Sequence, residues 1–87
     1  MHKLLICDDE IKIRETLYDY FTAKGYSVSI AENGKTGAEK TEDEDFDLII
    51  LDVMLPGKDG ISLLKMIKAS EELRDIPVIM ATAKGTE

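Results

Sequence analysis

The sequence lacks several features that would direct it toward particular functions. It has no tryptophan, two prolines and one cysteine, Cys7, among its 87 residues. A single cysteine forms no internal disulfide, and its place in an apolar run is typical of a small buried side chain rather than a reactive thiol. No apolar run approaches the ~20 residues needed to span a membrane. Residues 1–3 lead directly into a strand with no signal peptide before it, so we expect a cytoplasmic protein.

Positive charge is also scarce. Lysine and arginine number 11 against 18 acidic residues, for a formal net charge of −7. Binding to a phosphate backbone needs a basic face, so no direct nucleic-acid partner is expected. We interpret the acidic run at residues 39–47 as a solvated helix end and loop. With 44% hydrophobic and 33% charged residues, residues 1–87 have the composition of one globular domain.

Two strand-like runs end in acidic residues. Residues 48–51 are apolar and too few for a helix, which predicts a strand buried on both faces, and Asp52 follows them. Residues 3–7 form a similar run that leads into Asp8 and Asp9. Open parallel sheets keep their ligand sites at the carboxyl ends of the strands. These acids are therefore the first candidates for a functional site.

The remaining segments alternate between helix and strand patterns. Helices are predicted at about residues 11–24, 34–42 and 60–70, and further strands at residues 26–30 and 77–82. The resulting βαβαβαβ order predicts an α/β fold with right-handed crossovers and a parallel sheet. Polar and apolar residues alternate at 26–30, which indicates an edge strand.

The expected helices have different apolar faces. The residues predicted to face the core are Ile13, Leu17, Tyr20 and Phe21 in the first helix, and Ile61, Leu64 and Ile67 in the third. The second helix contains Gly37 and has only Ala38 as a clear apolar contact. Low propensity and a thin apolar face favour a mobile element.

Residues with known end-capping preferences flank these helices. Asp9 or Glu10 would begin the first helix, and Gly25 would close it in a left-handed conformation. Asn33 and Asp59 are expected as the N-caps of the second and third helices.

Asp8, Asp9 and Asp52 should converge at one edge of the sheet. Three ionised acids at close range repel one another, so either one takes a proton or a cation binds them. Mg²⁺ suits such a site because it accepts one or two carboxylates together with waters. Thr82 would bring a hydroxyl to the same edge, and the combination suits phosphoryl transfer onto a carboxylate. Taken alone, acids after a strand are also common helix caps.

Three segments of the chain resemble the receiver domain of two-component response regulators. They are LLICDDE at residues 4–10, LIILDVMLPGKDG at residues 48–60 and IPVIMATA at residues 76–83. The resemblance implies a flavodoxin-like, three-layer parallel sheet with strand order 2-1-3-4. It also implies that Asp52 accepts a phosphoryl group from a histidine kinase or a phosphotransfer protein. The domain would then be a regulatory phosphoacceptor rather than an enzyme.

The resemblance further implies roles for the neighbouring residues. Asp9 and Asp52 would ligate Mg²⁺ together with the backbone carbonyl of Met54, and Asp8 would act through water. Thr82 and the backbone of Ala83 would bind the phosphoryl group, and movement of Thr82 would alter an output surface.

Met54 and Lys84 correspond to positions at which the family tunes the lifetime of the phosphate. Family members also have a fifth strand, which carries a lysine that pairs with the phosphoryl group, and a fifth helix. Because the sequence stops at Glu87, we expect a truncated domain that lacks this catalytic lysine; Lys58 and Lys84 do not match its position. Residues 78–80 would then form an exposed apolar edge through which the domain dimerises.

Three alternatives compete with a signalling receiver. An Mg²⁺-dependent aspartyl phosphatase usually needs a second acid two residues after the nucleophile, where this sequence has Met54. A flavodoxin-like cofactor binder needs a phosphate-cradling loop after the first strand, whereas Asp8, Asp9 and Glu10 would repel phosphate. An inactive receiver fragment that associates into a dimer has every motif of the active domain, so the sequence does not separate the two.

Overall fold

The computed structural model describes residues 2–52, 55 and 60–81. The elements, in chain order, are β1 (Lys3–Cys7), α1 (Ile11–Ala23), β2 (Ser27–Ala31), α2 (Gly34–Asp43), β3 (Leu48–Asp52), α3 (Gly60–Ala69) and β4 (Val78–Ala81). Each predicted element is present, with boundaries that differ from the expected ones by a residue or so. The βαβαβαβ order expected from the sequence is confirmed.

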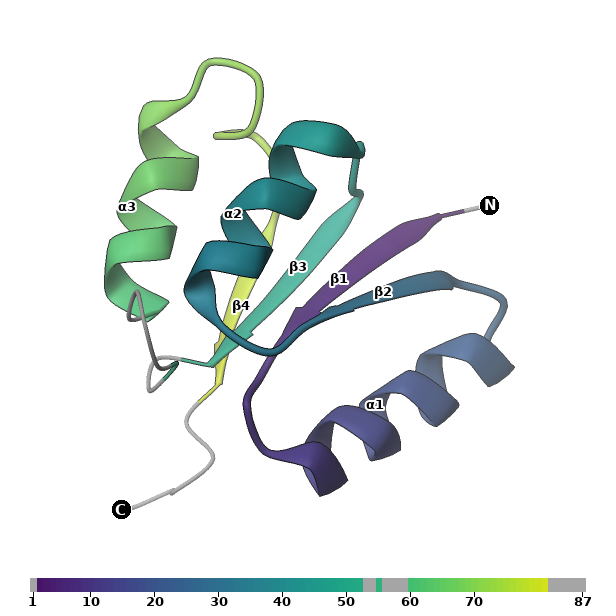
Figure 1. The fold of residues 1–87 in the computed structure, drawn as a ribbon. Coiled ribbons are helices and arrows are strands. Elements are labelled where there is room, and N and C mark those ends of the chain that lie inside the picture. The colour runs from purple at the N-terminus through teal and green to yellow at the C-terminus, as the bar shows by residue number, and fades with distance from the viewer. Residues whose placement is uncertain (1, 53–54, 56–59, 82–87) are drawn as a thin grey trace.

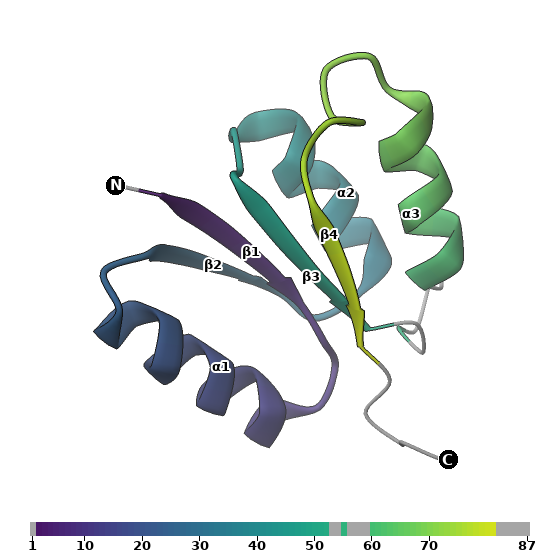
Figure 2. The ribbon, with the colours of Figure 1, turned by 180° about the vertical axis from the view of Figure 1, so that it is seen from behind.

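The four strands form one parallel sheet with the order β2-β1-β3-β4. Helices α2 and α3 cover one face of this sheet and α1 lies on the other (Figures 1 and 2). This arrangement confirms the three-layer, flavodoxin-like fold and places β2 at an edge, as its alternating pattern predicts. No helix in the described part of the chain has the length and apolarity required to cross a membrane.

The two central strands are buried because helices cover both of their faces. Leu4, Leu5 and Ile6 of β1 are fully buried, as are Ile49 and Leu51 of β3. Residues that alternate along these strands contribute to two separate cores, one beneath α2 and α3 and one beneath α1. The continuous apolar runs in the sequence are therefore a direct result of the two-sided cover.

Gly37 has a packing role that the sequence did not indicate. The residue is buried on the sheet-facing side of α2. A Cβ atom at this position would lie 3.1 Å from the Cys7 sulfur and 3.1 Å from a methyl of Leu63. The glycine that lowers helix propensity thus allows α2 to approach the sheet closely. Ala38 is the one α2 hydrophobic side chain packed against this core, as expected, and the backbone at the buried Gly37 adds to the contact.

The face beneath α1 is less completely covered. Leu17 and Phe21 pack against its core as predicted, but Tyr20 is 55% exposed, so its assignment to the buried face is wrong. Tyr20 instead lies edge-on to Phe21 and under the Lys24 ammonium group. Ile79 of β4 is 52% exposed.

The buried face of α3 is rotated from the predicted one. Leu63 and Ile67 are fully buried, whereas Ile61 is 46% exposed, so its assignment to the core face is wrong. Leu64 is partly buried and packs against the same core, as expected. The sequence does not decide which face of α3 is buried, because apolar residues lie on adjacent sides of this short helix.

The predicted helix ends can be compared with the structure at three places. Gly25 has φ +97°, the left-handed conformation expected after α1. The Asn33 side chain accepts a hydrogen bond from the Thr36 N–H at 2.8 Å, which confirms the N-cap of α2. Glu10 occupies the N-cap position of α1 but forms no side-chain capping bond. Asp59 lies outside the described residues.

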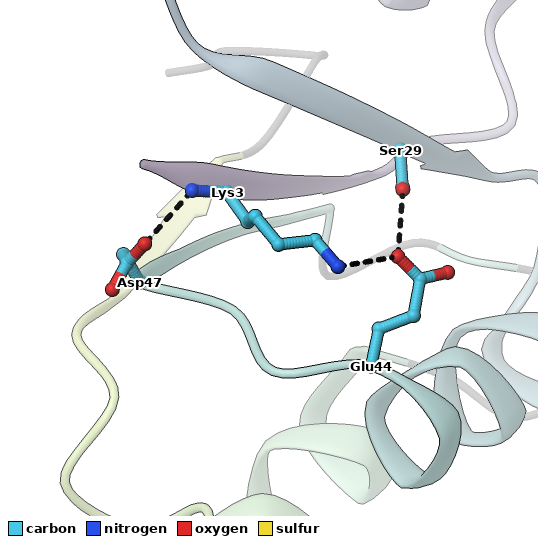
Figure 3. A network of polar contacts seen from close by, with 4 residues as sticks. All are labelled: Lys3, Ser29, Glu44 and Asp47. Carbon is cyan, nitrogen blue, oxygen red and sulfur yellow. Dashed lines mark hydrogen bonds and ion pairs between the residues drawn. The ribbon is translucent and has the colours of Figure 1, made fainter. Parts of the chain in front are cut away.

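At the amino ends of the strands, opposite charges are paired (Figure 3). The Lys3 ammonium group lies 3.1 Å from Glu44, whose carboxylate also accepts a hydrogen bond from the Ser29 hydroxyl at 3.4 Å. The backbone N–H of Lys3 donates to the Asp47 carboxylate at 2.8 Å. Two acids of the 39–47 run therefore attach the chain before β3 to β1 and β2. Asp47 nevertheless stays exposed, in agreement with the interpretation of the run as solvated, whereas Glu44 is partly buried by its contacts.

Candidate functional site

Adjacent strands bring the predicted acids together at the carboxyl ends of the strands. Strands β1 and β3 pair in parallel, with Cys7 next to Leu51. Asp8 and Asp52 each follow one member of that pair, so both emerge at the carboxyl ends of the strands. Asp9 is the next residue, on the turn toward α1. Their position matches the edge at which open α/β sheets bind ligands.

The three side chains form a compact cluster of oxygen atoms. Asp8, Asp9 and Asp52 each offer a carboxylate oxygen, and the three oxygens lie within 4.8 Å of one another. Asp8 is 3% exposed and Asp52 is 1% exposed, while Asp9 is exposed to solvent. Two acids are thus enclosed by protein and the third is open to solvent, which leaves one side of the cluster accessible.

Asp8 is fixed by hydrogen bonds at three of its groups. Its N–H donates to the carbonyl of Ala31 at 3.1 Å, extending the pairing of β1 with β2. Its carboxylate accepts from the Glu10 N–H at 2.9 Å. Its backbone carbonyl accepts from the guanidinium group of Arg14 at 3.1 Å. The turn that carries Asp9 is therefore tied to β2 and to α1.

The electrostatic environment of Asp8 disfavours its charge. Burial raises the pKa of the Asp8 carboxyl group above its usual value, and the negative charges of Asp52, Asp9 and Glu10 raise it further. The hydrogen bond from the Glu10 N–H acts in the opposite direction. The ionised form of Asp8 is therefore disfavoured unless a proton or a cation offsets its charge.

The single cysteine behaves as the sequence predicts. Cys7 is fully buried, and burial, followed by the charge of Asp8, raises the pKa of its thiol to about 12. The thiolate needed for nucleophilic or redox chemistry is therefore disfavoured. Cys7 instead provides a packing surface for α2 directly beneath the acids.

The donor set fits Mg²⁺. This ion prefers oxygen ligands at about 2.0–2.1 Å in octahedral geometry and commonly keeps several waters beside one or two carboxylates. Oxygens on opposite sides of such an ion are about 4.2 Å apart by the same geometry, close to the spread of this cluster. Asp8, Asp9 and Asp52 can therefore contribute to such a site, directly or through water.

Several predicted site residues cannot be placed in the same way. Met54, Thr82, Ala83 and Lys84 lie outside the described residues. The structure nevertheless shows one contact that the sequence does not predict, in which the Arg14 guanidinium group donates to the backbone carbonyl of Asp8. A basic residue one turn into a helix gives no signal of such a contact, because many arginines at that position face solvent.

A comparison with family models identifies the domain type. Residues 4–87 match the model of the response regulator receiver domain. The transcriptional regulatory protein ResD of Bacillus subtilis is 42% identical over 85 residues, which cover 98% of this chain and 34% of that protein. The chain spans roughly a third of the length of the curated relatives that it matches.

Solved structures agree with this result. The N-terminal domain of a response regulator receiver protein from Methanoculleus marisnigri superposes with a TM-score of 0.90 at 32% identity, covering 100% of this chain and 71% of that one. The receiver domain of sensor histidine kinase PA1611 from Pseudomonas aeruginosa has a TM-score of 0.90 at 28% identity, with 95% and 68% covered. The PA1611 structure holds a magnesium ion in its active-site cleft.

The family model, the relatives and the solved structures agree with one another, and the superpositions agree with the observed parallel sheet. The chain belongs to the response regulator receiver domain family.

Proposed function

We propose that this domain accepts a phosphoryl group on Asp52 in a Mg²⁺-dependent reaction and thereby switches an output surface. The observation that carries the proposal is the convergence of Asp8, Asp9 and Asp52, whose carboxylate oxygens lie within 4.8 Å of one another. The phosphodonor would be a histidine kinase or a phosphotransfer protein. The domain would act as a cytoplasmic regulatory element rather than as an enzyme with a separate substrate.

Asp52 is the best candidate for the acceptor because of its position in the sheet. It ends β3, which lies between β1 and β4. Ala81 of β4 pairs with Asp52 itself, and Cys7 of β1 pairs with the preceding residue, Leu51. A carboxylate oxygen of Asp52 would attack the phosphorus atom of the donor and form an O–P bond. The bond from phosphorus to the donor nitrogen would break, and its electron pair would stay with the imidazole.

The other two acids would hold the metal. Asp9 and Asp52 would ligate Mg²⁺ directly, with the backbone carbonyl of Met54 as a third ligand, and Asp8 would act through water. When bound, Mg²⁺ supplies positive charge that offsets the negative charge of the phosphoryl group. Without the ion, the charged form of Asp8 is disfavoured, because burial and the neighbouring acids raise its pKa.

Further roles are proposed for residues outside the described part of the chain. Thr82 and the backbone of Ala83 would bind the phosphoryl oxygens, and Thr82 would move toward the site when the group arrives. Met54 and Lys84 would tune the lifetime of the phosphate. A new charge that forms fixed hydrogen bonds is sufficient to change the conformation of a nearby segment.

Intact-mass spectrometry would test the acceptor directly. The protein is incubated with Mg²⁺ and acetyl phosphate, and we expect the gain of one phosphoryl group. Asp52→Asn should abolish the gain. Asp47→Asn is the matched control, because it makes the same chemical change in an exposed acid at the other end of the sheet.

Two results would contradict the proposal. One is phosphorylation of Asp52→Asn to the same extent as the unmodified sequence. The other is no gain of mass in a protein that circular dichroism shows to be folded and that Mg²⁺ demonstrably binds. The second result would favour the alternative of an inactive receiver fold that serves for association.

Self-association is a second candidate property, favoured by the edge strand β4. Ile79 is 52% exposed in the centre of this strand, and exposed apolar edges promote pairing with another chain. We propose that a second copy covers this region and forms a dimer. Sedimentation velocity at micromolar concentration would test it, with Ile79→Lys as the disrupting variant. A monomer with the unmodified sequence would rule out this mode of association.

A further inference from the structure

Arg14 contacts the backbone of the site rather than one of its carboxylates. Arg14 is the fourth residue of α1 and is partly buried. One guanidinium nitrogen, Nη1, donates a hydrogen bond to the carbonyl oxygen of Asp8 at 3.1 Å. The backbone N–H of Arg14 also bonds to the carbonyl of Glu10 at 3.0 Å. A single residue of the helix is thus attached to both ends of the turn that contains Asp9.

The first of these contacts fixes the peptide plane before Asp9. The carbonyl of Asp8 and the N–H of Asp9 belong to one planar peptide group, so orienting the carbonyl also orients the backbone of Asp9. The N–H of Asp8 is itself held by the carbonyl of Ala31 at 3.1 Å. Rotation of this peptide would therefore have to break the contact to Arg14.

The peptide plane after Asp9 is held by a different group. The N–H of Glu10 donates to the carboxylate of Asp8 at 2.9 Å, which orients the peptide group between Asp9 and Glu10. Both planes that flank Asp9 are thus constrained, one by Arg14 and one by Asp8. Asp9 is the exposed member of the acid cluster, so the turn itself must supply the order that burial gives to Asp8 and Asp52.

We propose that Arg14 is a positioning residue for cation binding, which holds the Asp8–Asp9 peptide so that the Asp9 carboxylate stays beside Asp8 and Asp52. The inference rests on the proposed Mg²⁺ site. A residue that orients a ligand can matter for affinity nearly as much as the ligand, and loss of such a partner typically weakens metal binding about 10- to 100-fold.

The sign of the effect separates positioning from simple electrostatics. Arg14 carries a positive charge, and removing a positive charge near an anionic site should strengthen the binding of a cation. Loss of positioning should weaken binding, because Asp9 must then be ordered when the ion arrives. The two effects act in opposite directions on one measured constant.

The test is a calorimetric titration with Mg²⁺ of the unmodified chain and of variants at Arg14. We expect Arg14→Ala to raise the dissociation constant about tenfold, and Arg14→Lys to recover part of the loss. Arg14→Met keeps the apolar stem without a donor and should match Arg14→Ala. Lys12→Ala is the control, since it removes an equal charge from an exposed position of the same helix and should leave the affinity unchanged or slightly higher.

Thermal unfolding in EDTA accompanies the titration. A residue that merely stabilises α1 would lower the melting temperature without changing the dissociation constant, and that result in Arg14→Ala and Arg14→Met would overturn the inference. A dissociation constant within twofold of the unmodified value would overturn it as well. If the unmodified chain binds no Mg²⁺, the proposed metal site fails and this inference fails with it.

Discussion

Charged side chains are arranged differently at the two ends of the sheet. At the amino ends of the strands, Lys3 is paired with Glu44 at 3.1 Å and its backbone is bonded to Asp47. At the carboxyl ends, three acids share a space within 4.8 Å, two of them buried. At the first end a lysine offsets the charge of an acid, whereas at the second the carboxylates of the cluster lie against one another.

The pKa values express this difference. Hydrogen bonding and attraction from Lys3 lower the pKa of Glu44, so its charge is favourable in the folded state. Burial and neighbouring acids raise the pKa of Asp8, so its charge is unfavourable there. The Glu44 contacts therefore favour the folded state, whereas the ionised form of Asp8 disfavours it.

The largest expected effect is that of Mg²⁺ on the carboxyl end. At a concentration of 100 times its dissociation constant, the ion should stabilise the folded protein by about 2.7 kcal/mol, measured as a rise in the unfolding midpoint. Asp9→Asn should abolish most of this increase. An equal response to Mg²⁺ in Asp9→Asn would show that the ion binds elsewhere.

The packing beneath the acids gives the next largest effect. Gly37→Ala introduces a methyl group 3.1 Å from Cys7 and 3.1 Å from Leu63, and such overpacking typically costs about 1–3 kcal/mol. The sign is informative, since glycine to alanine in an unconstrained helix gains about 0.5–1 kcal/mol. Urea denaturation would measure the change, with Lys35→Ala as an exposed control on the same helix. A stabilising Gly37→Ala would show that α2 has room to move away from the site.

Removing a charge from the carboxyl end should stabilise the protein in EDTA. We expect Asp8→Asn to increase the free energy of unfolding at neutral pH by about 1 kcal/mol, which corresponds to about 4–8 °C in melting temperature. The folded state holds the Asp8 proton at higher pH than the unfolded state does, so ionisation of Asp8 lowers the free energy of unfolding as the pH rises above the usual carboxyl value. The advantage of Asp8→Asn should therefore shrink as the pH falls toward the usual carboxyl value of 3.8. A lower free energy of unfolding for Asp8→Asn would show that the charge of Asp8 does not destabilise the fold.

The smallest effect, and the opposite sign, is expected at the amino end. Glu44→Gln should lower the free energy of unfolding by less than about 1 kcal/mol, because exposed ion pairs contribute little. The pKa of Glu44 is lowered in the folded state, so its contribution is present above the usual value of 4.5 and lost as the pH falls below it. Urea titrations at pH 7 and pH 3 would show the difference from the unmodified chain shrinking with acid. A gain in stability for Glu44→Gln at pH 7 would show that the two ends do not differ.

Much of the fold could be predicted because its strands and helices have recognisable patterns of apolar residues. Continuous apolar runs identify β1 and β3 as buried strands, and the βα alternation then implies a parallel sheet. The grouping of Asp8, Asp9 and Asp52 follows from the same argument, since parallel strands end at a common edge. The roles of these acids remain proposals.

The errors share a physical cause, which is that they depend on neighbours in space. The exposure of Tyr20 and Ile61 is set by how far each helix is rotated against the sheet, and apolar residues in adjacent directions leave that rotation open. Gly37 lowers the helix propensity of α2, but it suits this position because a Cβ atom there would lie only 3.1 Å from the Cys7 sulfur. The contact from Arg14 to Asp8 has no periodic pattern at all.

The register between β1 and β3 has a consequence for how the gene can change. Cys7 lies beside Leu51, and Asp8 and Asp52 each lie one residue beyond that pair. Replacing one apolar residue of either strand by another keeps the count, whereas losing or adding one codon shifts every later side chain to the opposite face. In-frame insertions and deletions within these ten codons should therefore be eliminated far more strictly than amino-acid replacements.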